Sequence, residues 1–437
     1  MKILIVHNRY REAGGEDAVV QTEFNLLKNF KEEVRLYERS NTEIDDYSFS
    51  QKLNFLWRMG RMGSTGSSCE ELRRILREFK PDVVHFHNIF FILTPAVYQV
   101  CIKENIPVVQ SLHNFRLLCS NALFFRNNKV CEECFEQKNL WRGVRYGCYK
   151  NSRGMTALLV RMLENHWKRG TWIKDVDMYI TATEFGRKKY IAAGIPSERI
   201  VVKPNIDVRS YSKIPVQLRV PRGVNMWEDP HWAEGPTGDS SRQDDPQQLC
   251  ADPKNGDGGY ALYAGRLSSE KGVDVLLKAW KKKAFLPLKI AGDGPLAAQL
   301  KEDARGIQNV EFLGFIPSDR YQDYFKNAKF LIVPSLCYEN FPRVVAEAYR
   351  YGIPVVASDL GGFPEIVLDQ QTGALFRAGD EDDLLKKIQW LVSQDQERPS
   401  MQKKIHELYT TLYSERRNYE TLKDVYSQAI ARKKNAG

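Results

Sequence analysis

The chain has 437 residues, of which 43% are hydrophobic and 27% are charged, so its length suggests two or three domains and its composition excludes a wholly disordered protein. No apolar run approaches the roughly 18 residues of a membrane span, and the apolar stretch at the start is too short for a signal peptide. We therefore expect a cytoplasmic protein. In that reducing compartment, the eight cysteines are expected to be thiols or metal ligands. The net charge of +9, from 64 Lys and Arg against 55 Asp and Glu, favours anionic partners such as nucleotides, phosphates, nucleic acid or an anionic membrane surface.

Short apolar runs alternate with helical patterns over residues 1–207. The runs are typical of strands buried on both faces of a sheet, and they are Lys2–Val6, Val83–His87, Val108–Leu112 and Met178–Ala182. Helical stretches such as Ala18–Lys28 and Cys69–Glu78 separate them. This alternation predicts a parallel sheet covered by helices on both sides, so we expect residues 1–207 to form a doubly wound α/β domain.

The alternation stops after Asp207 and resumes at Tyr260. Between Asn225 and Gly259 lie eight acids, four prolines and five glycines but no Ile, Val, Phe or Tyr. Such a segment buries too little apolar surface to offset its ordering entropy, so residues 208–258 are predicted to be a linker or insertion that is disordered in part.

A second doubly wound domain is predicted over residues 259–410, followed by a charged C-terminal helix over 411–437. Its strands are expected at Tyr260–Ala264, Leu286–Ala291, Val310–Leu313, Phe330–Val333 and Pro354–Ser358. Two such domains, joined by a linker, face each other across a cleft lined by the carboxyl ends of both sheets. Ligands bind at those ends in open α/β folds.

A glycine turn follows the first strand of the second domain. Gly265 allows the backbone to approach a ligand closely. Arg266 can donate two hydrogen bonds to a phosphate, and Lys271 adds a compact positive charge. The alternative interpretation is a tight turn that carries two solvated cations.

Two glutamates flank the start of a helix predicted over Arg343–Tyr351. Pro342 fits the first helical position, and the helix start offers unpaired N–H groups to an anion. Glu347, about one and a half turns further in, can accept both hydroxyls of a ribose, while Glu339 can face a sugar. The alternative is a capped surface helix with solvated acids.

Taken together and in order, these motifs resemble family 4 of the glycosyltransferases, the group 1 retaining nucleotide-sugar transferases of the GT-B fold. The resemblance rests on Gly265-Arg266-Leu267, Glu270-Lys271-Gly272, Gly292-Asp293-Gly294-Pro295, Glu339 with Glu347, Gly361-Gly362-Phe363-Pro364-Glu365 and, in the first domain, Gly14-Gly15 and Leu112-His113-Asn114. It implies two Rossmann-like domains and covers most of the chain except Pro215–Gly259.

The resemblance implies roles in donor binding. Arg266 and Lys271 would hold the donor diphosphate and neutralise the leaving group. Glu347 would bind the ribose, Glu339 would approach the transferred sugar, and Gly15 would let the first domain close on the phosphates.

Further roles concern the sugar. Asn340 and Phe341 would offer backbone N–H groups, and His113 would contact the sugar near the anomeric carbon; the alternative for His113 is a core histidine at a strand end. Asn340-Phe341-Pro342 stands where the family often has Gly-Phe-Gly, which leaves the donor sugar open. We expect no cofactor for catalysis, because Arg266, Lys271 and the helix N-terminus can neutralise the leaving group without a metal.

Four cysteines lie between residues 119 and 148, within the first domain. Cys119, Cys131, Cys134 and Cys148 are spaced C-x11-C-x2-C-x13-C, and the central Cys-x2-Cys pair has the spacing of a structural zinc knuckle. Four thiolates would close such a site and exclude catalysis by the metal. The alternative is four unrelated thiols.

The expected function is retaining transfer of a sugar from a nucleoside-diphosphate sugar to a polysaccharide or lipid-linked glycan. One alternative is a nucleotide-sugar epimerase, which shares the GT-B architecture. Another is a zinc-ribbon protein that binds nucleic acid; the assembled donor motifs outweigh it, so we expect no nucleic-acid partner.

Two basic stretches of the first domain predict a peripheral position at the inner face of the plasma membrane. Lys138–Lys174 contains nine Lys and Arg and the single acid Glu164, and Lys52–Arg61 is also basic and aromatic. Basic residues beside Trp, Phe and Leu favour an anionic bilayer surface. The alternative is that Met155–Leu163 packs in the core while the cations form a solvated face.

Overall fold

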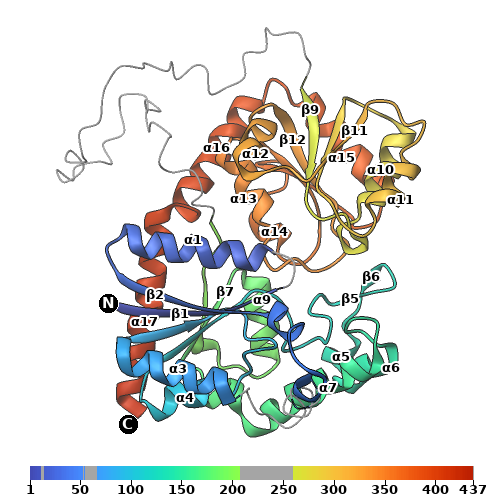
Figure 1. Cartoon of the computed structure of the whole chain (residues 1–437). Coiled ribbons are helices and arrows are strands. Elements are labelled where there is room, and N and C mark those ends of the chain that lie inside the picture. Colours follow the sequence, from blue (N-terminus) through green and yellow to red (C-terminus); the bar gives the residue numbers. More distant parts are fainter. Residues whose placement is uncertain (11–13, 53, 55–65, 207–258, 437) are drawn as a thin grey trace, which may run out of the picture.

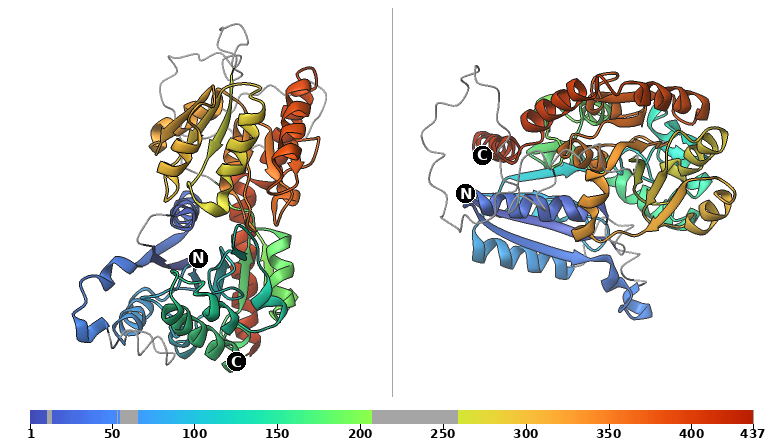
Figure 2. Two further views of the ribbon diagram at one scale, coloured as in Figure 1. Left: turned by 90° about the vertical axis from the view of Figure 1, so that its right-hand side faces the viewer. Right: turned by 90° about the horizontal axis from the view of Figure 1, so that it is seen from above.

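The computed structural model describes residues 1–10, 14–52, 54, 66–206 and 259–436. Figures 1 and 2 show two α/β domains stacked one above the other, with the N-terminal half of the chain below and the C-terminal half above. The predicted linker over 208–258 and all of Lys52–Arg61 except Lys52 and Asn54 lie outside the described residues.

The first domain is built on a parallel six-stranded sheet with the order β2-β1-β3-β4-β7-β8. Its strands are β1 (Lys2–Arg9), β2 (Glu33–Ser40), β3 (Val83–Phe86), β4 (Val108–Leu112), β7 (Met178–Thr181) and β8 (Ile200–Val202). The four strands predicted from apolar runs are all present. The two that were missed, β2 and β8, are the edge strands, and β2 alternates exposed and half-buried residues instead of forming an apolar run.

Helices cover both faces of this sheet. They are α1 (Gly15–Asn29), α3 (Gly66–Phe79), α4 (Val97–Lys103), α7 (Arg153–Arg169), α8 (Thr171–Lys174) and α9 (Glu184–Ala192). Between β4 and α7, the chain forms a small excursion of a two-stranded hairpin, β5 (Phe125–Arg126) and β6 (Lys129–Val130), and two short helices, α5 (Glu133–Glu136) and α6 (Trp141–Tyr146).

The second domain repeats the plan with the strand order β11-β10-β9-β12-β13-β14. Its strands are β9 (Tyr260–Ala264), β10 (Leu288–Ala291), β11 (Val310–Gly314), β12 (Ala328–Val333), β13 (Val355–Ser358) and β14 (Gly373–Phe376). Its helices are α10 (Val273–Lys282), α11 (Ala297–Asp303), α12 (Ser318–Lys326), α13 (Arg343–Arg350), α14 (Phe363–Ile366), α15 (Glu381–Ser393) and α16 (Arg398–Leu412).

The C-terminal helix returns to the first domain. The helical pattern over Met401–Lys433 is interrupted at Tyr413 and Ser414, where α16 ends and α17 (Glu415–Ala436) begins. Helix α17 runs alongside the first domain (Figure 1) and contacts α1, β3, β4 and β7. Because α16 packs on α13 of the second domain, the pair of helices joins the two domains.

The apolar core explains why these elements form. The central strands are fully buried, with Ile3, Ile5, Val83 and Leu331 at 0% exposure, and burying each such side chain is worth about 1.5–3 kcal/mol. In the described part of the chain, no helix combines the length and the apolar character needed to cross a membrane.

Candidate active site

A charged cluster surrounds Glu339 in the loop between β12 and α13. The Lys271 Nζ atom lies 2.5 Å from Glu339 Oε1, and the Ser335 hydroxyl donates to the same oxygen at 2.9 Å. Burial alone would lower the pKa of Lys271, but the Glu339 carboxylate raises that pKa above its ordinary value. Lys271 is therefore a cation at neutral pH, held at the carboxyl edge of the second sheet.

Several glycine turns meet at this edge of the sheet. Gly272 has φ of +65°, and a Cβ there would lie 2.0 Å from the Pro334 carbonyl oxygen, so the turn that carries Lys271 presses directly on the loop that carries Glu339. The Gly362 N–H donates to the Glu339 carbonyl at 3.3 Å. A Cβ on Gly292 would similarly collide with the Gly265 carbonyl, at 1.8 Å.

A hydrogen bond across the domains joins the sequence neighbours of the two predicted catalytic residues. The Asn340 Nδ2 group donates to the Leu112 carbonyl at 2.6 Å, and Asn340 is only 6% exposed. His113 follows Leu112 directly, and Glu339 directly precedes Asn340. His113 and Glu339 therefore flank a single interdomain contact. The sequence motifs did not indicate this role for the Asn340 side chain.

His113 is oriented by a second histidine. His113 Nε2 and His87 Nδ1 lie 2.8 Å apart, so one of the two rings donates to the other. Burial lowers the pKa of both rings below the ordinary histidine value, and the neutral rings can share this hydrogen bond. His113 is half-buried, whereas His87 is 2% exposed and acts as its support.

A buried ion pair lies behind these histidines. Glu23, His85 and His87 place three potential metal ligands within 4.8 Å of one another, the one such group among the described residues. However, the Lys203 Nζ atom lies 2.8 Å from Glu23 Oε1. Because this ammonium already neutralises the carboxylate, we assign the group as a structural ion pair. His85 is also held by Ser111 and by Tyr426 of α17, each at 2.9 Å.

The buried histidines predict a fall in stability in mild acid. Burial lowers the pKa of His85 and of His166 to about 4. Between pH 6.5 and 4 the unfolded chain binds these protons and the native chain does not. The free energy of unfolding therefore falls as the pH falls, by up to about 1.4 kcal/mol for each unit by which the native pKa lies below the unfolded one.

Urea unfolding at pH 7.5 and 5 measures this fall in the free energy of unfolding, which His166→Asn should reduce. His406→Asn, at an exposed position on α16, is the control; an identical fall in all three proteins contradicts the assignment.

Gly15 begins α1, with Gly14 as the N-cap residue. Asp17 fixes this turn, accepting from the Gly14 N–H at 2.7 Å and contacting His7 Nε2 at 2.8 Å. The neighbouring Glu16 carboxylate accepts a hydrogen bond from Asn114, the residue after His113. Gly15 is exposed and lies beside the loop that carries His113, as the predicted closure on a ligand requires.

The remaining donor-side residues lie in the loop after β9 and on α13. Arg266 is exposed directly after β9. Glu347 is 8% exposed within α13, and Arg343 Nη2 lies 3.4 Å from its Oε1 atom. Pro342 is the N-cap residue of this helix, which begins at Arg343, so the prediction of Pro342 as the first helical residue was wrong by one position.

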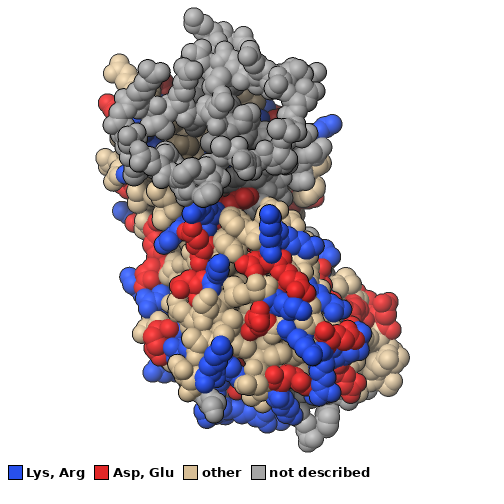
Figure 3. Space-filling view, turned by 90° about the vertical axis from the view of Figure 1, so that its left-hand side faces the viewer, with Lys and Arg blue, Asp and Glu red and all other residues tan. Residues whose placement is uncertain are grey.

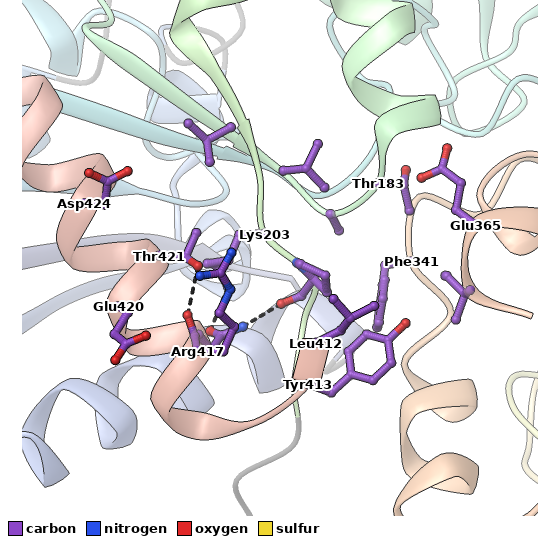
Figure 4. Close-up of a pocket in the computed structure, with 16 residues that line it drawn as sticks. Thr183, Lys203, Phe341, Glu365, Leu412, Tyr413, Arg417, Glu420, Thr421 and Asp424 are labelled. Carbon is purple, nitrogen blue, oxygen red and sulfur yellow. Dashed lines mark hydrogen bonds between the residues drawn. The ribbon is translucent and has the colours of Figure 1, made fainter. Parts of the chain in front are cut away.

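Phe341 faces a pocket that neither His113 nor Glu339 lines. Its ring faces Tyr413 at a centroid distance of 5.8 Å, and both line a pocket of about 580 Å³ between the domains (Figure 4). None of the predicted catalytic residues lines this pocket. At its edge, Glu365 of α14 accepts from the Glu184 and Phe185 N–H groups at 2.6 and 2.5 Å, and so caps α9 across the domain boundary. The pocket is therefore separate from the predicted catalytic residues.

Two family models match the chain. Glycosyltransferase Family 4 matches residues 30–206, and Glycosyl transferases group 1 matches residues 246–407. Each therefore covers one of the two domains, and the second includes every predicted donor-side residue from Gly265 to Glu347.

Curated relatives agree with these matches. An uncharacterized glycosyltransferase of Methanocaldococcus jannaschii is 32% identical over 33% of this chain and 42% of its own length. Lipopolysaccharide 1,2-N-acetylglucosaminetransferase of Salmonella typhimurium is 32% identical over 35% of this chain and 44% of its own. The gpi3 subunit of phosphatidylinositol N-acetylglucosaminyltransferase from Schizosaccharomyces pombe is 22% identical over 74% and 62%. The chain thus matches less than half the length of the first two.

Solved structures share the fold along almost the whole chain. Anabaena HepE in complex with UDP aligns with a TM-score of 0.61 at 14% identity, covering 98% of this chain and 100% of that one. Sucrose-phosphate synthase from Thermosynechococcus elongatus aligns with a TM-score of 0.64 at 15% identity, covering 98% and 99%. At such identities the similarity establishes the fold alone.

Proposed function

The chain belongs to the group 1 glycosyltransferases of GT-B fold, and from this we propose that it transfers a sugar, with retention of configuration, from a nucleoside-diphosphate sugar to a polysaccharide or lipid-linked glycan. The observation that carries the proposal is the meeting of Lys271, Glu339 and Ser335 beside the Asn340–Leu112 hydrogen bond. Structures of the similar HepE contain UDP, UDP with glucose, or UDP-glucose, which supports a nucleotide-sugar donor.

The charges around Glu339 suit departure of a diphosphate. In the proposed reaction, the bond from the anomeric carbon to the diphosphate oxygen breaks, and an acceptor hydroxyl forms the new bond on the same face. The acceptor proton passes to the leaving phosphate. Arg266 and Lys271 would stabilise the charge that develops on this phosphate, so the step needs no catalytic metal.

Glu339 and His113 suit the sugar side. Lys271 and Ser335 both contact Glu339 Oε1, so the carboxylate is oriented and its second oxygen is left for a sugar hydroxyl. His113, held by His87, would contact the sugar from the first domain. In this proposal both residues position the sugar and support its oxocarbenium-like transition state.

A donor panel tests the proposed function. We expect the full-length protein to release nucleoside diphosphate from one nucleotide sugar and to transfer that sugar to a lipid-linked or polysaccharide acceptor. NMR of the product should show the anomeric configuration of the donor. Interconversion of free nucleotide sugars without transfer would instead identify an epimerase, and an inverted product would exclude the retaining mechanism.

We also propose that the first domain presents α6 to an anionic membrane surface. Trp141 and Tyr146 on α6 are 45% and 41% exposed, and Arg145 shares the face of Trp141 because the two are four residues apart.

By contrast, Leu159 and Leu163 of α7 are 0% exposed, so the alternative of core packing is correct for Met155–Leu163. The face with α1 and α17, seen in Figure 3, mixes both charge signs.

Vesicle co-sedimentation tests the membrane proposal. Each basic residue near an anionic surface is worth about 1 kcal/mol, about fivefold in partitioning. Arg145→Gln combined with Lys150→Gln, both at exposed positions, should therefore weaken binding to vesicles with anionic lipid by about 30-fold. Arg305→Gln, on the second domain and 78% exposed, is the control. Equal partitioning of all three proteins would leave α6 without a membrane role.

A further inference from the structure

The excursion between β4 and α7 is built from elements too short to be stable alone. The strands β5 and β6 have two residues each, α5 has four and α6 has six. Isolated helices below about 12 residues and single hairpins are marginal in water. Yet Phe125 and Leu140 in this segment are only 8% and 7% exposed. Leu140 packs on the core of the first domain, and a cross-link would add to that packing in holding the segment in one conformation.

Four cysteines converge inside this excursion. Cys119, Cys131, Cys134 and Cys148 line one small cavity of about 10 Å³, about what a single water-sized occupant needs. They come from four separate pieces: the loop after β4, the residue after β6, helix α5 and the turn after α6. The spacing alone did not establish that the outer two cysteines join the central pair.

The wall of this cavity is closely packed. A Cβ on Gly143 would lie 2.3 Å from the Ser120 hydroxyl oxygen and 3.7 Å from Cys134 Sγ, so α6 approaches the cysteines closely only because this residue is glycine. Arg126 and Glu133 also line the cavity. Their side chains pair at 3.0 Å, and Arg142 pairs with Glu133 at 2.6 Å.

We propose that Cys119, Cys131, Cys134 and Cys148 together bind one structural zinc ion. Four thiolates complete a tetrahedral zinc site, with the sulfurs roughly 3.8 Å apart at zinc–sulfur distances of about 2.3 Å. In the described chain no three of these sulfurs lie within 4.8 Å of one another, so the metal would draw them inward. Binding releases the four thiol protons to solvent, and the guanidinium of Arg126 would offset the net negative charge of the zinc-thiolate group.

The proposed zinc site would also support the loop that carries Glu339. Glu132, between the central cysteines, accepts a hydrogen bond from the Tyr338 hydroxyl of the second domain and pairs with Lys189 of α9. Phe125 of β5 packs with Leu336 and Cys337 of the same loop. The hairpin rises from the first domain towards the second in Figure 1. This positioning role, unlike the zinc site itself, rests on the proposed function.

Metal analysis of the purified full-length protein tests the zinc site. We expect one zinc per chain after dialysis, and one in the control variant Cys69→Ser, whose cysteine lies on α3 outside the cluster. Cys134→Ser should lose at least nine-tenths of the metal. Because Cys134→Ser could fail to fold, an independent measurement on the wild-type protein is needed. Thiol titration of the native wild type, with and without a chelator, provides it. Four more thiols per chain should react once the chelator has removed zinc. Absence of zinc from wild type, both as purified and after incubation with zinc under reducing conditions, would overturn the proposal.

Glu132→Gln separates the zinc site from its role in positioning Glu339. This variant should keep one zinc per chain but lower kcat/KM for sugar transfer by about tenfold, whereas Glu136→Gln, an exposed position on α5, should change neither. Unchanged transfer in Glu132→Gln would overturn the positioning role. Its zinc content would still report on the metal site, and wild-type transfer would still report on the proposed function.

Discussion

Replacing Lys271 with methionine should lower kcat/KM for transfer by about 10- to 150-fold. Methionine keeps much of the side-chain length but removes the charge, and a hydrogen bond to a charged group is worth about 1.5–3 kcal/mol. The Lys271 ammonium lies 2.5 Å from Glu339 Oε1, so its loss also leaves a carboxylate that is only 15% exposed without its cation. Both effects should reduce stabilisation of the departing diphosphate.

The control for this change is Lys278→Met on α10. Lys278 is 61% exposed and pairs with Asp274 at 3.3 Å, so the change in charge is the same while the position is solvent-exposed. Steady-state kinetics and thermal unfolding should show wild-type behaviour for Lys278→Met. Lys271→Met should still unfold in one cooperative transition, at a lower temperature because the Glu339 carboxylate has lost its cation. Wild-type donor affinity and rate in Lys271→Met would show that the diphosphate clamp is misassigned.

Strands buried on both faces could be predicted from sequence because they are continuous apolar runs. Strands such as β3, whose residues are all buried, show this pattern clearly. The edge strand β2 does not, because solvent reaches it and charged residues are tolerated there. The other edge strand, β8, is apolar but only three residues long. The break between α16 and α17 also carries no proline or glycine signal. It arises where buried Tyr413, at 2% exposure, packs against Phe341.

The positions of the donor-side turns were predictable for a topological reason. In a parallel sheet, the residues that follow each strand meet at one edge, so Lys271 and Glu339 could be placed together without knowledge of their contacts. What could not be predicted are the polar contacts between domains. Asn340 bonds a carbonyl 228 positions away, Glu365 caps a helix 181 positions away and Tyr338 contacts Glu132 206 positions away. No local pattern encodes such partners, since they depend on how the domains dock.

Glu347→Gln should remove recognition of the donor ribose. Gln keeps the shape of Glu347 but replaces a charged acceptor by a neutral amide, and the ribose hydroxyls would lose one or two charge-assisted hydrogen bonds worth about 1.5–3 kcal/mol each. Donor affinity should therefore fall by about 10- to 150-fold or more. The Arg343 guanidinium, 3.4 Å from the Glu347 carboxylate, remains as a second partner for the amide oxygen, so α13 should stay folded.

A comparison of nucleotides makes this prediction specific to the ribose. Calorimetry should show that the wild-type protein binds a ribonucleoside diphosphate more tightly than its 2′-deoxy analogue, because the carboxylate accepts from both hydroxyls. Glu347→Gln should bind the two nucleotides with similar affinities, since the group that distinguishes them is weakened. Glu302→Gln, on α11 and 55% exposed, is the matched control and should keep the wild-type preference. If Glu347→Gln also kept that preference in full, Glu347 would not contact the ribose, and its burial within α13 would serve only the pairing with Arg343.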